Sequence, residues 1–232
     1  MFYPPRCPVC DDLSQGQGRT CEKCSNVFLL IKEPRCMKCG KQLTKSEAEY
    51  CMDCNKKTFT YVRGYPLWLY NSRMKRSVSA FKYHNKKEYG KYYAREIAKV
   101  FGKDLKKLNI QCMIPVPVHK KRLRKRGYNQ AEVLANELSK YLKIPVNTNL
   151  LIRCKNTLPQ KELNDMERLK NLTSAFKIIK NNDIIIDNIK RVLLVDDIYT
   201  TGSTIEACTR VLMQAGVEEV YYVSICIGKG FY

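Results

Sequence analysis

The segment from Val192 to Thr204, VLLVDDIYTTGST, places two aspartates and a hydroxyl-rich turn directly after a run of four aliphatic residues. The aliphatic run predicts a buried strand, and in a parallel α/β sheet ligands bind beyond the carboxyl ends of the strands. Asp196 and Asp197 would stand at such an end. We therefore interpret their carboxylates as groups that hold ribose hydroxyls or the water on a Mg²⁺ ion.

The residues that follow the two acids suit a phosphate group. Gly202 permits a close approach of the backbone, and the hydroxyls of Thr200, Thr201, Ser203 and Thr204 add donors at the start of a predicted helix. Backbone N–H groups in such a turn bind a phosphate monoester without a lysine. Acids and turn together predict a site for a pentose 5-phosphate. The alternative, a helix N-cap with two unrelated acids, leaves the aspartates unexplained.

Eight of the 12 cysteines form four Cys-x-x-Cys pairs, with 10, 11 and 11 residues between successive pairs. Two such pairs complete a tetrahedral zinc site. Pairing in chain order predicts one zinc ion on Cys7, Cys10, Cys21 and Cys24, and a second on Cys36, Cys39, Cys51 and Cys54. The spacing also permits a cross-braced arrangement. Redox-active pairs are the competing interpretation, but four regularly spaced pairs exceed what redox chemistry requires. We expect the other cysteines to be small core residues: Cys112, Cys154, Cys208 and Cys226.

Basic residues are concentrated in one part of the chain. Between Arg73 and Gly127 there are 18 basic and three acidic residues, so this segment carries +15 of the net charge of +20. Aromatic residues are interleaved with the basic ones. This pattern suits single-stranded nucleic acid, whose phosphates bind cations and whose bases stack on aromatic rings. A solvated basic face and ordinary packing of the aromatic residues in a helical core remain alternative explanations.

Predicted strands and helices alternate along the rest of the chain. We expect strands at 61–70, 112–118, 145–152, 191–195 and 220–227, and helices at 73–83, 88–101, 130–142, 165–169 and 203–214. The stretch 119–127, HKKRLRKRG, is expected to be a basic loop. This alternation predicts an α/β fold with a parallel sheet flanked by helices.

The length of 232 residues allows one full-sized domain and a small appendage. We expect a zinc-ribbon domain over residues 1–58 and an α/β domain over residues 59–232. No stretch approaches the roughly 20 apolar residues of a membrane span. The first residues also lack the apolar region of a signal peptide. We therefore expect a cytoplasmic protein without a membrane span.

The segment 192–204 resembles the phosphoribosyl-pyrophosphate (PRPP) motif of type I phosphoribosyltransferases, which has about four aliphatic residues, two acids, two variable residues and a Thr/Gly-rich turn. Tyr199 departs from the pattern, because a smaller aliphatic residue is commoner there. The resemblance implies a phosphoribosyltransferase-like sheet. It also implies that Asp196 and Asp197, the candidate catalytic residues, hold the ribose diol, and that the turn 200–204 holds the 5-phosphate of PRPP bound with Mg²⁺.

A second resemblance, to the ComF/ComFC family of bacterial competence proteins, covers nearly the whole chain. It rests on the zinc ribbon, then PVPVHKKRLRKRGYNQAEVLA, NTLPQKEL and ERLKNLTSAF, and then the PRPP motif, in this order. The matching residues are Arg122, Arg126, Gly127, Asn129, Gln130, Thr157, Gln160, Leu163, Arg168, Asn171 and Phe176. The eight cysteines fit members with a double ribbon. The resemblance implies DNA uptake in natural transformation, single-stranded DNA as a ligand and a helicase-like partner.

The same resemblances imply roles for the basic stretch after CMIPVPV. Lys120, Lys121 and Arg122 become candidates for holding pyrophosphate. Arg122, Arg124, Lys125 and Arg126 become candidates for contacting DNA.

Three functional hypotheses follow. The first is a DNA-uptake factor that binds PRPP or a related ribose 5-phosphate, and the basic segment favours it. The second is an active phosphoribosyltransferase, for which neither His84 nor His119 lies in a recognisable acceptor-binding motif. The third, a zinc-ribbon adaptor on a degenerate enzyme fold, is disfavoured because VDDIYTTGST keeps both its acids and its phosphate turn.

Overall fold

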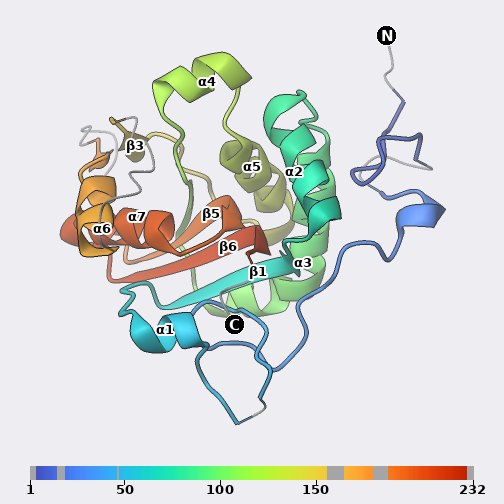
Figure 1. Cartoon of the computed structure of the whole chain (residues 1–232). Helices are drawn as coiled ribbons and strands as arrows, with labels where there is room; N and C mark the ends of the chain where they lie inside the picture. The colour runs from blue at the N-terminus through green and yellow to red at the C-terminus, as the bar shows by residue number, and fades with distance from the viewer. Residues whose placement is uncertain (1–3, 15–18, 46, 156–164, 180–187, 229–232) are drawn as a thin grey trace.

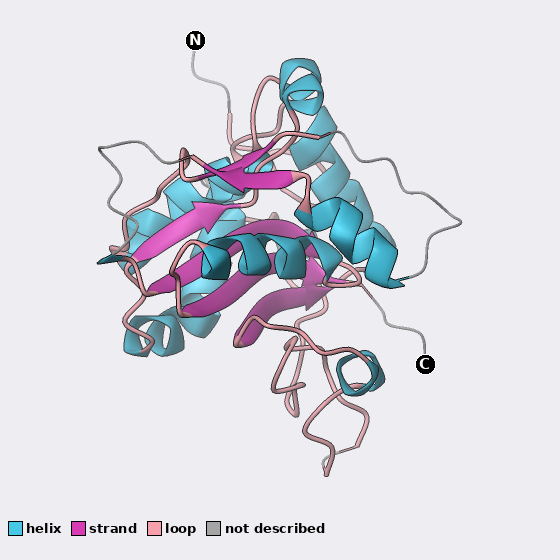
Figure 2. Ribbon diagram, turned by 90° about the vertical axis from the view of Figure 1, so that its left-hand side faces the viewer, coloured by secondary structure: helices cyan, strands magenta, loops and turns pink. Residues whose placement is uncertain are grey.

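The computed structural model describes residues 4–14, 19–45, 47–155, 165–179 and 188–228. Its core is a parallel sheet with strands in the order β1 (Arg63–Leu69), β6 (Glu219–Ile227), β5 (Arg191–Tyr199) and β2 (Cys112–Pro115). A parallel bridge from Met113 to Val146 extends the sheet beyond β2. Helices cover both faces of the sheet (Figure 2). The predicted α/β class is confirmed.

Two hydrophobic clusters lie on the two faces of the sheet. On one face, α2 (Ser72–Tyr83), α3 (Tyr89–Lys107) and α5 (Gln130–Leu142) pack against Leu193 and Val195 of β5. On the other face, α7 (Ser203–Gln214) packs against Val192 and Leu194. Because β5 is buried on both faces, its sequence reads as a continuous aliphatic run.

Four smaller elements complete the α/β part of the chain. A short helix, α4 (Lys120–Arg126), stands above the carboxyl ends of the strands (Figure 1). The helix α6 (Asp165–Thr173) lies next to α7. The strands β3 (Leu151–Arg153) and β4 (Phe176–Ile178) form a separate antiparallel pair. No helix in the described ranges is long and apolar enough to cross a membrane.

The N-terminal segment is packed onto the α/β domain at several points along its length. A 3₁₀ turn, η1 (Glu22–Cys24), and a short helix, α1 (Met52–Lys56), are its helical elements. Asp11 accepts a hydrogen bond of 2.7 Å from the Tyr89 hydroxyl of α3. Further along, Leu69 of β1 donates its N–H to the Leu29 carbonyl at 2.9 Å. Gly64 of β1 then donates to the Lys38 carbonyl at 2.8 Å. Leu29 and Lys38 therefore lie along the β1 edge of the sheet, whereas Asp11 lies against α3.

Most of the stretch 119–127 forms the helix α4, with His119 and Gly127 as its caps, so the predicted loop is wrong. The His119 ring accepts a hydrogen bond from the Lys121 N–H at 3.2 Å and so caps the start of α4. Gly127 ends the helix with φ +79° and donates its N–H to the Leu123 carbonyl at 2.7 Å. No residue of α4 is buried, so apolar periodicity could not reveal it.

The predicted strand 145–152 is interrupted. The Asn147 side chain accepts hydrogen bonds from the N–H groups of Asn149, at 3.0 Å, and Leu150, at 2.9 Å. This turn separates the bridge at Val146 from β3. Of the four cysteines predicted to be core residues, Cys154 is exposed and that prediction is wrong, whereas Cys112, Cys208 and Cys226 are buried.

One buried carboxylate joins α7 to the residues just before β1. Glu206 is 1% exposed, and it accepts hydrogen bonds from the Thr60 N–H at 2.7 Å and the Thr60 hydroxyl at 3.0 Å. Arg210 also donates to it at 2.7 Å, but the Arg210 side chain is 42% exposed.

We predict that Glu206→Ala lowers the free energy of unfolding by about 3 kcal/mol, because the Thr60 donors lose their charged acceptor. The matched variant Arg210→Ala should cost less than about 1 kcal/mol, since its ion pair is partly solvated. Urea unfolding of both variants measures the difference. Equal effects would contradict this assignment.

Candidate functional site

The two aspartates of the motif lie within β5, which continues to Tyr199 instead of ending at Val195 as predicted. Asp197 is 4% exposed. Asp196 is half-buried, and its carboxylate accepts the N–H of Asp197 at 2.8 Å. The strand thus carries both carboxylates to the carboxyl edge of the sheet.

Lys82, near the end of α2, forms an ion pair with one of these two aspartates. Its ammonium nitrogen lies 2.7 Å from a carboxylate oxygen of Asp197, and the two side chains are 18% and 6% exposed. Lys82 was not predicted from the sequence, because nothing in its local pattern distinguishes it from the other basic residues of 73–127. Only the fold brings α2 over the end of β5.

The environment shifts the pKa of both neighbours of Asp197. Burial, and after it the charge of Asp197, raises the pKa of the Asp196 carboxyl well above its ordinary value. Burial lowers the pKa of Lys82, but the charge and hydrogen bond of Asp197 outweigh it, so this pKa lies above the ordinary lysine value. Lys82 therefore stays charged at neutral pH.

The turn after β5 leads into α7 without a capping side chain, because Gly202 occupies the N-cap position. The first N–H groups of a helix have no partner within the helix. Gly202 has φ +81°, and a Cβ atom there would lie 2.3 Å from the Tyr199 hydroxyl. Thr200 and Thr201 are exposed, whereas Ser203 and Thr204 are half-buried. These backbone N–H groups and hydroxyls can receive an anion.

Tyr199 has a structural role that explains the departure from the motif. Its ring stacks on Tyr222 with centroids 4.9 Å apart, and its hydroxyl lies 2.8 Å from that of Tyr61. Tyr222 in turn donates a hydrogen bond of 2.9 Å to the Cys39 carbonyl. The large ring thus connects the turn to the second group of cysteines.

The six predicted basic residues of α4 fall into two groups. Five are exposed on the helix: Lys120, Lys121, Arg122, Arg124 and Lys125. Arg126 is half-buried and donates to the Gln130 side chain at 2.7 Å and to the Tyr83 hydroxyl at 3.0 Å. Because β2 and β5 are parallel neighbours, α4 and the aspartates stand at the same edge of the sheet.

Arg153 of β3 is a second basic residue near the site that was not predicted from the sequence. Burial, and after it the charge of Arg122, lowers its pKa, while Asp196 acts in the opposite direction. The Arg153 guanidinium therefore interacts electrostatically with Arg122 of α4 and with Asp196 of the acidic pair. No motif marked it in the sequence, because β3 becomes a neighbour of the site only in the fold.

Other residues that matched the family pattern are structural or lie outside the described ranges. The Asn129 side chain caps α5 at the Ala131 N–H, 3.1 Å away, and donates to the Val116 carbonyl at 3.1 Å. Gln130 holds Arg126, Phe176 is buried, and Asn171 is exposed. Thr157, Gln160 and Leu163 fall outside the described residues, as does the side chain of Arg168.

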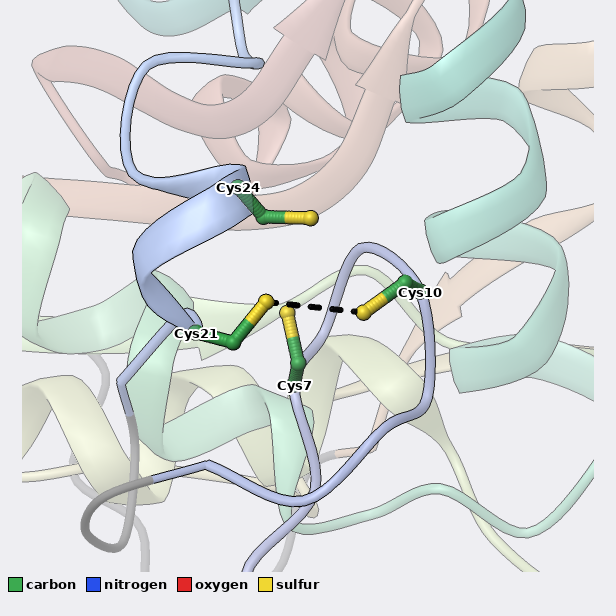
Figure 3. A group of neighbouring side chains, drawn as sticks. All are labelled: Cys7, Cys10, Cys21 and Cys24. Atoms are coloured by element: carbon green, nitrogen blue, oxygen red, sulfur yellow. Dashed lines mark hydrogen bonds between the residues drawn. The ribbon is translucent and has the colours of Figure 1, made fainter.

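The eight N-terminal cysteines form two tetrads in the predicted chain order. These are Cys7, Cys10, Cys21 and Cys24, and Cys36, Cys39, Cys51 and Cys54, with the sulfur atoms of each tetrad within 4.8 Å of one another. In the first tetrad all four side chains point toward a common centre (Figure 3).

The sulfur spacing fits zinc. The Cys10 and Cys21 sulfurs are 3.7 Å apart, and the Cys39 and Cys51 sulfurs are 3.6 Å apart. Tetrahedral zinc with bonds of about 2.3 Å separates its sulfur ligands by about 3.8 Å. Four thiols at this spacing are the donor set of a structural zinc ion, and the cross-braced alternative is excluded.

Comparisons with known protein families agree with this architecture. Residues 1–55 match the family described as "Double zinc ribbon domain", and residues 128–230 match "Phosphoribosyl transferase domain". A hypoxanthine phosphoribosyltransferase from Staphylococcus aureus is 17% identical, with a TM-score of 0.38, over 60% of this chain and 62% of that chain. A purine phosphoribosyltransferase from Pyrococcus horikoshii has a TM-score of 0.35 at 16% identity, over 60% of this chain and 73% of that chain. Neither of these two likenesses identifies a substrate.

Relatives match along most of the chain. Competence protein F of Haemophilus influenzae is 31% identical over 94% of this chain and 95% of its own length. Competence protein ComFC of Bacillus subtilis is 28% identical over 88% of this chain and 82% of its own length. The DNA utilization protein YhgH of Escherichia coli O157:H7 is 25% identical over 97% of this chain and 98% of its own length. With its double zinc ribbon and phosphoribosyltransferase domain, this chain belongs to the ComF/ComFC family of competence proteins.

Proposed function

We propose that this protein binds PRPP, or a related ribose 5-phosphate, together with Mg²⁺, and that it binds single-stranded DNA in support of natural transformation. One observation carries the sugar-phosphate part. Asp196 and Asp197 lie near the carboxyl end of the parallel strand β5, and a short turn leads from this end to α7, whose N-cap is a glycine. The carboxylates that can accept hydrogen bonds from a ribose diol thus precede, by a few residues, the N–H groups that can donate to a phosphate. Both sets lie at one edge of the sheet, as a pentose 5-phosphate requires.

The donor set suits Mg²⁺ that arrives with the ligand. Mg²⁺ keeps several waters and binds through one or two carboxylates together with substrate phosphates. Asp197 is already paired with Lys82, and Asp196 accepts a backbone N–H. Asp196 would hold the ion through water, and the ion would neutralise pyrophosphate charge beside Lys120, Lys121 and Arg122.

The exposed cations of α4 support the DNA part of the proposal. Arg122, Arg124 and Lys125 project from a helix with no buried residue, so they are free to contact a strand of phosphates. Arg126 contributes less directly, because it is bonded to Gln130 and Tyr83. The names of the competence and DNA utilization relatives agree with a DNA ligand. The helicase-like partner, the cytoplasmic location and the domain boundary at residue 58 stay predictions.

A phosphoribosyltransferase acting on an unidentified acceptor is the second candidate. It is favoured by the acidic pair, the turn of 200–204 and the basic α4, which surround one sheet edge as a transfer reaction would require. Sustained release of pyrophosphate from PRPP and Mg²⁺ with a panel of purine and pyrimidine bases would establish turnover. Binding without release would favour the first candidate.

We predict that PRPP binds in the presence of Mg²⁺ and that Asp196→Asn weakens it roughly 10- to 100-fold, because a ribose hydroxyl or a Mg²⁺-bound water that loses its carboxylate acceptor costs about 1–3 kcal/mol. The control Asp104→Asn removes an exposed acid of α3 and should leave the affinity unchanged. Titration calorimetry gives both values. A wild-type protein that fails to bind any ribose 5-phosphate would refute the site.

Charge reversal of Arg122, Arg124 and Lys125 to Glu should weaken single-stranded DNA binding. It should also flatten the plot of log affinity against log salt by about two units, since each phosphate contact on a single strand contributes about 0.7. The matched triple variant reverses Lys103, Lys106 and Lys107, which are exposed near the end of α3, before β2 begins. Fluorescence anisotropy at several salt concentrations compares them. Equal losses in the two variants would show that α4 is not the specific surface.

The two tetrads predict two zinc ions per chain by elemental analysis. Cys36→Ser should leave one zinc and destabilise the fold by several kcal/mol, because structural zinc contributes directly to folding. Cys154→Ser alters an exposed cysteine outside the tetrads and should leave two. If wild-type protein purified without chelator held no zinc, the tetrads would need another explanation.

A further inference from the structure

The Lys82–Asp197 pair has chemical consequences at the proposed sugar-phosphate site. Lysine is rarely buried unless it is paired, and this ammonium lies 2.7 Å from the Asp197 carboxylate, with both side chains largely shielded from water. In the proposed function Lys82 enters only as the ion-pair partner of Asp197. The pair also lies one residue from Asp196, so a positive charge resides next to two adjacent carboxylates.

Two adjacent carboxylates create a problem for a ligand that carries phosphate groups. Unneutralised, they would repel a sugar phosphate and attract a free divalent cation, because oxygen donors in a carboxylate pair suit Mg²⁺ and Mn²⁺. A resident ammonium group bound to Asp197 reduces this negative charge. The ammonium contacts one Asp197 oxygen, so the other oxygen is the one that would accept a hydrogen bond from a ribose hydroxyl.

Contacts on either side of Lys82 fix its position. Phe81 is fully buried and packs against Tyr93 with ring centroids 5.4 Å apart. Tyr83 receives the Arg126 guanidinium at 3.0 Å on its hydroxyl, and the same cation lies over its ring. The last turn of α2 is therefore attached to the core before Lys82 and to α4 after it.

We propose that Lys82 is a positioning residue of the sugar-phosphate site. It acts as a built-in counter-ion that aims Asp197 at a ribose hydroxyl and takes the place of a divalent cation bound directly by the two aspartates. In this arrangement the acidic pair recognises the sugar, and Mg²⁺ enters only with a pyrophosphate group. The inference rests on the proposed function, and it assigns separate roles to Lys82, the two aspartates and Mg²⁺ within that site.

The test compares wild type with Lys82→Met, Lys82→Arg and the control Lys75→Met, which removes an exposed lysine from the same helix. Ribose 5-phosphate binding is measured by calorimetry without added divalent cation. Mn²⁺ binding is measured by electron paramagnetic resonance without any sugar. Zinc-loaded full-length protein is used throughout, and thermal melting confirms that each variant is folded.

We expect wild type and Lys75→Met to bind ribose 5-phosphate without Mn²⁺ and to hold no Mn²⁺ at this site. Lys82→Met should lose at least about tenfold in ribose 5-phosphate affinity and should gain a Mn²⁺ site. That Mn²⁺ site should disappear in the double variant Lys82→Met/Asp196→Asn. Lys82→Arg, which keeps the charge, should restore most of the sugar affinity.

Two results overturn the inference: wild-type sugar affinity in Lys82→Met, or no Mn²⁺ gained by that variant. Failure of the proposed function is distinguishable, because wild type would then bind neither ribose 5-phosphate nor PRPP, while the Mn²⁺ comparison still tests the counter-ion. Should Lys82→Met not fold, Lys82→Gln, which keeps a polar end but no charge, is measured with the same expectations.

Discussion

In the sheet, β5 runs between β2 and β6 and is paired in parallel with both. Helices cover both of its faces, so a polar residue on this strand can reach solvent or a ligand only near its ends. The parallel pairing also brings the end of β2, and with it α4, to the same edge. The acidic pair, the turn before α7 and the basic helix converge because of this one arrangement.

The double zinc ribbon is part of the same packing. Tyr222 of β6 donates to the Cys39 carbonyl within the second tetrad, and its ring supports Tyr199 at the end of β5. A change in the second tetrad therefore acts on residues next to the phosphate turn. The loop that carries the first tetrad contacts another part of the molecule. There Asp11 accepts a hydrogen bond from Tyr89 of α3 and forms an ion pair with Lys86, in the turn before α3.

The predictable features have local signals. The continuous aliphatic run of β5, the apolar spacing of α5 and the spacing of the Cys-x-x-Cys pairs follow from the geometry of a strand buried on both faces, of a helix and of a zinc site. Features that depend on distant contacts were not predictable. Lys82 pairs with Asp197 only because α2 passes over the end of β5. The helix α4 lacks an apolar face, and the turn at Asn147 acts through side-chain hydrogen bonds that strand propensity does not reveal.

The central claim is that the carboxyl edge of β5 holds a ribose 5-phosphate between an acidic pair and the start of α7. A crystal structure of the zinc-loaded protein with PRPP and Mg²⁺ tests it most directly. We predict the 5-phosphate on the backbone N–H groups of residues 200–204, with ribose hydroxyls within hydrogen-bonding distance of Asp196 and Asp197. A ligand bound elsewhere, or an empty edge at saturating PRPP, would contradict the account.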